Sequence, residues 1–167
     1  MASSTSTLTS TVYDPPPNFA LVHPQLYRSS AFTTAHIPFV TSLKLRTCIS
    51  LGAELPSRVL TSWAEQQGVR LVHLGGQRDL TKEMKDWKPV QEELIKDALE
   101  FVLEKANNPC LVMDHSGVYE TGIFVGCLRK LERWALSAVL AEYASIAGSK
   151  VRAANEVGHA IEIDSCQ

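Results

Sequence analysis

The residues best placed to do chemistry lie in one short loop of the sequence. Asp114 and Glu120 bound this loop, and Gly117 lies between them. A strand that runs through a glycine-containing loop into a helix N-terminus is typical of phosphate sites, because backbone N–H groups converge there on an anion. This loop, however, contains no Lys or Arg. Its architecture predicts an anion site, whereas its side chains predict repulsion of an anion.

The elements on either side of the loop follow from the apolar pattern. Residues 110–113 are apolar and predict a buried strand, and an amphipathic helix is expected to begin near Thr121. We expect this helix to bury the apolar stripe Ile123, Phe124, Cys127, Leu128, Leu131 and Trp134. Its outer face is expected to carry Arg129, Lys130, Glu132 and Arg133.

The rest of the chain predicts strands alternating with helices. We expect strands at 19–22, 25–28, 46–51 and 69–74, and helices at 35–43, 56–67, 89–106, 137–147 and 153–163. The segment 75–88 is polar and glycine-led, so it predicts a surface loop. Strand, helix and strand at this spacing favour a three-layer α/β fold, with a mixed or mainly parallel sheet flanked by helices.

Composition favours one ordinary globular domain. Apolar residues make up 45% of the 167-residue chain and charged residues 20%. We predict a disordered Ser/Thr-rich tail at 1–12 and a single domain at 13–167. The net charge is near −2, so the composition does not predict the excess of positive charge that binds nucleic acid or an anionic membrane. No apolar run approaches the roughly 18 residues that span a bilayer.

The cysteines and histidines show no metal-ligand spacing, so we expect neither a metal site nor a cofactor. Cys48, Cys110 and Cys127 lie in apolar runs, where a free thiol behaves as a small buried hydrophobe. Reduced thiols and the lack of a signal-type N-terminus predict a cytoplasmic protein, with the nucleus as an alternative.

Several separated motifs resemble the plant and fungal atypical dual-specificity phosphatases, within the cysteine-dependent tyrosine phosphatase superfamily. These are Pro-Pro-Asn-Phe at 16–19, Leu-Tyr-Arg-Ser at 26–29, the segment from Thr121 to Trp134, and Ala141 to Arg152. They occur in the order typical of this family, which includes the oxidant-induced cell-cycle-arrest proteins of fungi. The resemblance implies the dual-specificity phosphatase fold.

Active members of this family carry the loop His-Cys-x-x-Gly-x-x-Arg-Thr-Gly. The resemblance aligns Gly117, Thr121 and Gly122 with that pattern without a gap. It places Met113 at the family His, Asp114 at the nucleophilic Cys and Glu120 at the phosphate-binding Arg. The frame is retained, but the nucleophile and the cation are lost. The degenerate loop comprises Asp114, His115, Ser116, Gly117, Val118, Tyr119 and Glu120.

A carboxylate is a poor substitute for a thiolate nucleophile, and Glu turns the bidentate attraction of Arg into repulsion. We therefore predict a catalytically inactive pseudophosphatase, a regulatory or scaffolding subunit that partners active family phosphatases as a hetero-oligomer. We also hypothesise that Asp114 folds into the loop N–H groups near Val118 and Tyr119 as an internal substitute for phosphate. A negative charge near a helix N-terminus is stabilising, so Glu120 would contribute roughly 0.3 to 1 kcal/mol to the stability of the helix.

Three alternatives remain open. Asp114 and Glu120 could bind a cation together with His115. The chain could be a weak or atypical phosphatase acting on phosphotyrosine or inositol pyrophosphates, with Asp79 or Asp86 as the general acid. It could also bind phosphate without cleaving it. The cationic helix face at Arg129, Lys130 and Arg133 is a candidate partner surface.

Overall fold

Five strands form one mixed sheet at the centre of the protein. The computed structural model describes residues 13–77 and 92–148. The strands are β1 (Ala20–His23), β2 (Leu26–Ser30), β3 (Thr47–Ser50), β4 (Arg70–His73) and β5 (Cys110–Asp114). They lie in the order β1-β2-β5-β3-β4. Only β1 and β2 pair antiparallel, while β2, β5, β3 and β4 are parallel, so the expected mainly parallel sheet is confirmed.

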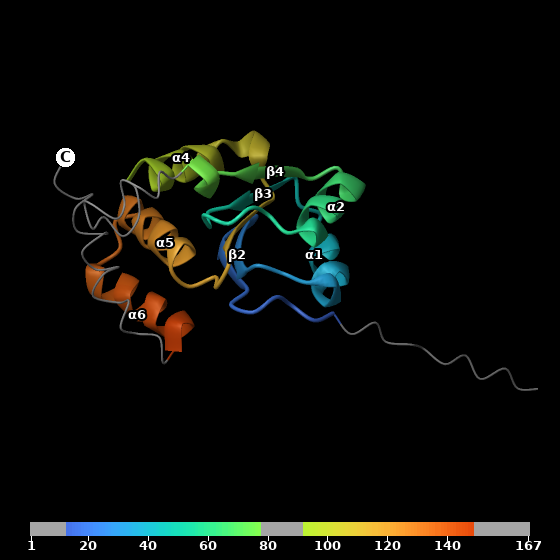
Figure 1. The fold of residues 1–167 in the computed structure, drawn as a ribbon. Coiled ribbons are helices and arrows are strands. Elements are labelled where there is room, and N and C mark those ends of the chain that lie inside the picture. The colour runs from blue at the N-terminus through green and yellow to red at the C-terminus, as the bar shows by residue number, and fades with distance from the viewer. Residues whose placement is uncertain (1–12, 78–91, 149–167) are drawn as a thin grey trace, which may run out of the picture.

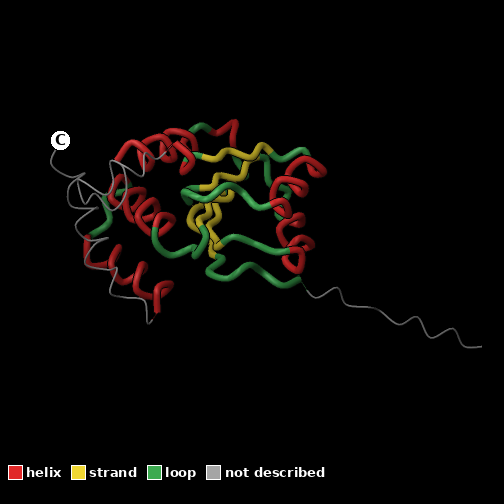
Figure 2. The backbone as a smooth tube through the Cα atoms, in the orientation of Figure 1, coloured by secondary structure: helices red, strands yellow, loops and turns green. Residues whose placement is uncertain are grey.

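Helices cover both faces of this sheet (Figures 1 and 2). On one side lie α1 (Ile37–Ser42) and α2 (Arg58–Gln67), and on the other lie α4 (Glu92–Leu103), α5 (Glu120–Leu131) and α6 (Leu136–Ala147). Side chains alternate between the two cores, because successive residues of a strand point to opposite faces. Leu111 and Met113 of β5 join the core under α1 and α2, whereas Cys110 and Val112 join the other. The expected three-layer architecture is confirmed.

The first predicted helices begin and end where local signals place them. Ser57 caps α2, since its hydroxyl accepts a hydrogen bond from the Leu60 N–H at 3.3 Å. Gly68 ends α2 in the left-handed conformation at φ 65°. Pro38 lies in the first turn of α1, which follows a short 3₁₀ turn, η1 (Thr34–His36). These boundaries are therefore set by local sequence.

Other predicted boundaries shift or fall beyond the described residues. The helix expected at 89–106 ends at Leu103, and a separate 3₁₀ turn, η3 (Lys105–Asn107), follows it. The segment 75–88 begins as a 3₁₀ turn, η2 (Gly75–Gln77). The tail at 1–12, most of the loop at 75–88, the start of the 89–106 helix and the helix expected at 153–163 lie outside the described residues.

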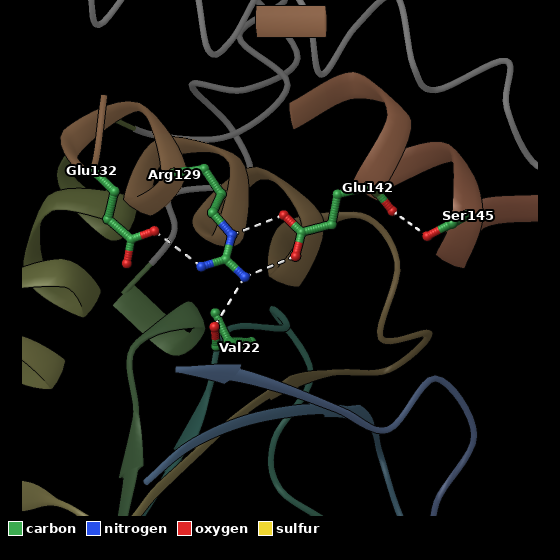
Figure 3. Close-up of polar contacts among 5 residues, drawn as sticks. All are labelled: Val22, Arg129, Glu132, Glu142 and Ser145. Carbon is green, nitrogen blue, oxygen red and sulfur yellow. Dashed lines mark hydrogen bonds and ion pairs between the residues drawn. The ribbon is translucent and has the colours of Figure 1, made fainter. Parts of the chain in front are cut away.

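The prediction that Arg129 lies on an outer face is wrong. Arg129 is only 6% exposed. Its Nε and Nη2 donate to the two carboxylate oxygens of Glu142 at 2.9 and 2.8 Å, which joins α5 to α6 (Figure 3). Nη1 donates to Glu132 at 3.0 Å, and Nη2 also donates to the Val22 carbonyl of β1 at 2.9 Å. Hydrogen bonds to Glu142 raise the pKa of Arg129. We call Arg129, together with Glu132, Glu142 and the Val22 carbonyl that it bonds, the Arg129 clamp.

The end of the predicted apolar stripe is also wrong. Leu131 is 61% exposed and Trp134 is 42% exposed, whereas the earlier members of the stripe are buried. The helix ends at Leu131, and Arg133 turns the chain away in a left-handed conformation at φ 65°. Trp134 instead stacks on the Arg129 guanidinium, whose carbon lies 4.4 Å from the ring centroid.

No helix in the described ranges 13–77 and 92–148 has the length and apolar character needed to cross a membrane.

Candidate functional site

The loop from Asp114 to Glu120 lies where three parallel strands end. Ser30 of β2 pairs with Asp114, and Ser50 of β3 pairs with Met113. The carboxyl ends of β2, β5 and β3 therefore meet at one edge of the sheet, which is the usual site of ligands in open α/β folds. Helix α5 begins at Glu120, immediately after the loop.

The carboxylate of Asp114 is folded into this loop. One oxygen accepts the backbone N–H groups of Ser116 at 2.6 Å and Gly117 at 2.5 Å, and the other accepts that of Thr121 at 2.8 Å. The Ser116 hydroxyl also donates to Asp114, at 3.0 Å. Asp114 is only 2% exposed. Both oxygens are therefore engaged by the protein itself.

The hypothesis that Asp114 satisfies the loop from within is confirmed, but with different partners. The sequence predicts donors from the amides of Val118 and Tyr119. The Val118 N–H instead donates to the Ser116 hydroxyl at 3.0 Å. Asp114 is the last residue of β5, and its short side chain accepts from the N–H groups two and three residues later, as in an Asx turn, and from that of Thr121 in the first turn of α5.

Close packing fixes the frame of the loop. Gly117 has φ +67°, and a Cβ there would meet the Ser30 nitrogen at 2.4 Å. A Cβ on Gly122 would meet the Tyr143 ring at 2.5 Å, so α6 packs directly on the first turn of α5. Thr121 is fully buried, and its hydroxyl has no hydrogen-bond partner among the residues that the structure describes. Glycine is required at both positions for lack of space.

Two residues from the start of the domain brace the loop, and neither was predicted from the sequence to contact it. Arg28 of β2, only 3% exposed, donates from Nη2 to the Gly117 carbonyl at 2.6 Å. Asn18 donates from its side-chain amide to the Ser116 carbonyl at 2.8 Å. Burial lowers the pKa of Arg28, and the carboxylates of Asp114 and Glu142 partly offset that effect. The available signal was the place of Asn18 and Arg28 in the two N-terminal motifs, Pro-Pro-Asn-Phe at 16–19 and Leu-Tyr-Arg-Ser at 26–29, that resemble the family.

A pocket of about 300 Å³ opens beside the loop, and we call it the lateral pocket. Its apolar wall includes Phe32, Leu55, Leu60 and Met113. Glu54, Asp114 and Glu120 also line it, together with His115. No Lys or Arg is among the described residues that line it. The pocket therefore carries negative charge next to apolar surface.

The described candidate residues are not gathered into a metal site. His115 is exposed. Across residues 13–77 and 92–148, no group of three His, Cys, Asp or Glu side chains is placed to hold a metal ion. Asp79 and Asp86, the candidate general acids, lie outside the described residues.

Known proteins resemble this chain over most of its length. The model of the tyrosine phosphatase family matches residues 13–163. The chain belongs to the tyrosine phosphatase family. A probable tyrosine-protein phosphatase, DG1060, of Dictyostelium discoideum is 39% identical over 142 residues, which is 85% of this chain and 83% of that protein.

Relatives of this phosphatase family member also include proteins named for inositol phosphates. Inositol diphosphatase DSP1 of rice, Oryza sativa subsp. japonica, is 38% identical over 138 residues, covering 83% of this chain and 60% of that protein. The crystal structure of the core catalytic domain of PP-IP phosphatase SIW14 from S. cerevisiae, in complex with citrate, superposes with a TM-score of 0.79. Its sequence is 30% identical, over 90% of this chain and 87% of that one.

Proposed function

We propose that this phosphatase family member is a catalytically inactive pseudophosphatase that binds other proteins as a regulatory or scaffolding subunit. The observation that carries the proposal is the buried Asp114 carboxylate, which engages the Ser116, Gly117 and Thr121 amides. Donors of this kind would otherwise face the oxygens of a bound phosphate. An anion that binds the loop must therefore displace an internal anion.

The resemblance to the family adds a chemical argument. It aligns Asp114 with the nucleophilic Cys of active members and Glu120 with their phosphate-binding Arg. A carboxylate is a weaker nucleophile toward phosphorus than a thiolate of lowered pKa. A unit charge pair at about 4 Å and an effective dielectric near 20 is worth about 4 kcal/mol. Glu in place of Arg at such a position replaces an attraction by a repulsion, so it disfavours binding of a phosphate dianion by about several kcal/mol.

The names of the relatives favour a second candidate, a weak or atypical phosphatase. Proteins named tyrosine-protein phosphatase and inositol diphosphatase match most of this chain. On that reading the chain would cleave phosphotyrosine or inositol pyrophosphates with a nucleophile other than Asp114. A third candidate, a phosphate sensor, would bind such groups without turnover.

Phosphate release by the purified full-length chain separates these candidates. The substrates are an aryl phosphate and an inositol pyrophosphate, and the yeast SIW14 catalytic core serves as the active control. We expect no release above the buffer rate from the wild type or from Asp114→Ala. Turnover that survives Asp114→Ala but disappears with Asp79→Ala would contradict the proposal. Heat of binding with millimolar phosphorylated ligand, without turnover, would favour the sensor.

The regulatory role is tested by what the protein binds. We propose active members of the same family as its partners, in the cytoplasm or the nucleus. A tagged chain purified from its native cells should retain at least one family phosphatase through a salt wash. Recovery of the chain without any family phosphatase would contradict the partnership and leave the catalytic argument unaffected.

A further inference from the structure

The edge of the sheet opposite the loop carries a cluster of cations. Strands β3, β4 and β5 are parallel, so they all begin at this edge and end at the edge with the loop. The segments 43–46, 67–70 and 103–109 lie at the starts of these strands. Their cations are Lys44, Arg46, Arg70 and Lys105, and all four are exposed. Glu104 is the one acidic residue of these segments. We call the four cations the cationic edge.

Backbone hydrogen bonds bring these segments together. The Arg46 N–H donates to the Pro109 carbonyl at 2.8 Å, and the Arg70 N–H donates to the Arg46 carbonyl at 2.9 Å. Neighbouring strands lie about 5 Å apart, so the starts of β5, β3 and β4 together span roughly 10 Å. That is the length of about three residues of extended chain. The cationic edge is therefore compact enough to contact one short segment of another molecule.

Two of the guanidinium groups are held in place by the protein. Arg46 donates from Nη1 to the Ala106 carbonyl at 2.8 Å. The Arg70 guanidinium carbon lies 4.9 Å from the centroid of the Phe101 ring, which is within the range of a cation–π contact. No cation of this edge forms an ion pair within the described ranges 13–77 and 92–148. A positioned guanidinium without a carboxylate partner is suited to donate to an anionic group of another molecule, because little side-chain freedom is lost on binding.

The two edges of the sheet carry opposite charge. Glu54, Asp114 and Glu120 line the lateral pocket at the loop edge, where no Lys or Arg is among the described lining residues. The chain as a whole has a net charge near −2, so the cationic edge is a local excess of positive charge. A patch of one sign attracts and orients a partner of the opposite sign. The charge pattern therefore directs an acidic partner to the cationic edge.

An exposed apolar side chain in the same place limits the class of partner. Leu103, the last residue of α4, is 61% exposed and lies two positions before Lys105. Contacts between proteins combine apolar and charged groups, whereas binding to a nucleic-acid backbone is dominated by its phosphates. A segment that carries both carboxylates and an apolar side chain can contact Leu103 as well as the cations. The cationic edge therefore favours a protein segment over nucleic acid.

We propose that the cationic edge binds a short acidic segment of a partner protein, with carboxylates on Arg46, Arg70 and Lys105. An apolar side chain of that segment packs against Leu103. The inference rests on the proposed regulatory or scaffolding role, because such a subunit requires a surface for its partner. It places that surface at the end of the sheet away from the degenerate loop.

Titrations followed by NMR test the proposal on the full-length chain. The probe is a short peptide of alternating Glu and Leu with blocked ends. One comparison peptide has Gln in place of every Glu, another has Ser in place of every Leu, and oligothymidylate supplies the phosphates of a nucleic acid. We expect saturable amide shifts centred on Arg46, Arg70 and Lys105. The probe should bind at least about fivefold more tightly than the Gln peptide at about 50 mM salt, and most of that difference should disappear at about 300 mM.

Matched variants assign the binding to named side chains. Lys105→Gln should weaken binding of the probe about two- to fivefold, as expected for an exposed charge. Arg70→Gln should weaken it about three- to tenfold, because a positioned guanidinium makes a stronger charge-assisted contact. Arg58→Gln makes the same charge change at an exposed position in the first turn of α2, and should leave the affinity unchanged. Lys105 forms no ion pair with a described residue, so its variant tests the proposal even where Arg70→Gln perturbs the fold.

Several results would overturn the inference. Equal binding of the Gln peptide or the Ser peptide would do so, as would the absence of saturable shifts at about 1 mM probe. Equal effects of Lys105→Gln and Arg58→Gln would assign the binding to net charge. Tighter binding of oligothymidylate than of the probe would assign the cationic edge to nucleic acid. None of these results depends on phosphate release or on a co-purified phosphatase, which test the proposed function separately.

Discussion

Asp114 shows how a single side chain can satisfy the N–H groups of a loop from within. Its carboxylate accepts hydrogen bonds from three backbone N–H groups and one hydroxyl. Hydrogen bonds to a charged acceptor are stronger than neutral ones, and a buried carboxylate requires them. Arg28 adds a buried cation nearby, since it bonds the Gly117 carbonyl of the same loop. Side chains of the protein itself therefore hold the loop.

Removal of this carboxylate should expose the loop amides. We predict that Asp114→Ala lowers the free energy of unfolding by about 2 to 4 kcal/mol, because buried N–H groups lose their acceptor. We also predict that phosphate or tungstate raises the melting temperature of Asp114→Ala but not that of the wild type, because a vacated anion site gains affinity. Differential scanning fluorimetry with and without the oxyanion measures both effects.

Asp97→Ala is the matched control for this experiment. Asp97 is exposed on α4, so its loss removes one negative charge away from the loop. A similar response to oxyanion in Asp97→Ala would assign the effect to net charge. An unchanged response of Asp114→Ala would show that its carboxylate does not occupy an anion site.

Helix α5 is anchored at both ends, and this fixes the direction from which it meets the loop. At its start, Thr121 donates to Asp114 and Gly122 contacts the Tyr143 ring of α6. At its end, the Arg129 clamp joins it to Glu142 of α6 and to the Val22 carbonyl of β1. Helix α6 therefore contacts α5 near both ends.

Loss of the clamp should destabilise the domain more than loss of an exposed cation on the same stretch. We predict that Arg129→Met lowers the free energy of unfolding by about 2 to 3 kcal/mol. The expected loss is below that of a fully buried pair, because the Glu142 side chain is 29% exposed. Arg133→Met, at an exposed position just after α5, should change stability by less than about 0.5 kcal/mol. Urea unfolding of both variants measures the difference, and equal losses would contradict the clamp.

The whole molecule buries thiols in both of its cores. Cys48 packs under α1 and α2, and Cys110 packs under α4, α5 and α6. Burial raises the pKa of both thiols, in the case of Cys110 from 9.0 to about 12. The neutral thiol is therefore favoured in the folded state, and the thiolate, which is the reactive form, is suppressed.

These thiols should be inert until the protein unfolds. We predict no alkylation of Cys48 or Cys110 by iodoacetamide in the native protein at pH 7 to 9, and complete alkylation in guanidinium chloride. Above pH 9 the unfolded chain loses thiol protons that the folded chain keeps, so stability should fall as pH rises from about 9 toward about 12. Mass spectrometry of the labelled peptides assigns each site. Native labelling of Cys48 or Cys110 at pH 8 would contradict their burial.

Local sequence was sufficient to predict the order of the helices and strands in the described part of the chain and the position of the loop. Ser57, Gly68 and Pro38 lie at helix ends because capping and fixed φ act over a few residues. The apolar runs of β3 and β5 were predictable because a parallel strand buried on both faces has no polar alternation. The negative charge of the loop was also predictable, because Asp114 and Glu120 lie on either side of Gly117 in the sequence.

Contacts between distant residues were decided only by the tertiary structure. The helical pattern placed Arg129 outside, but α6 and β1 cover it, and neither contact leaves a signal in its local sequence. The bracing of the loop by Arg28 and Asn18, and the lateral pocket at Ser50, likewise depend on how strands pair. The sequence by itself determined that the loop carries carboxylates in an anion-binding frame. The tertiary structure decided how the loop is held around Asp114, because Arg28 of the adjacent strand β2 bonds the Gly117 carbonyl and Asn18 bonds the Ser116 carbonyl.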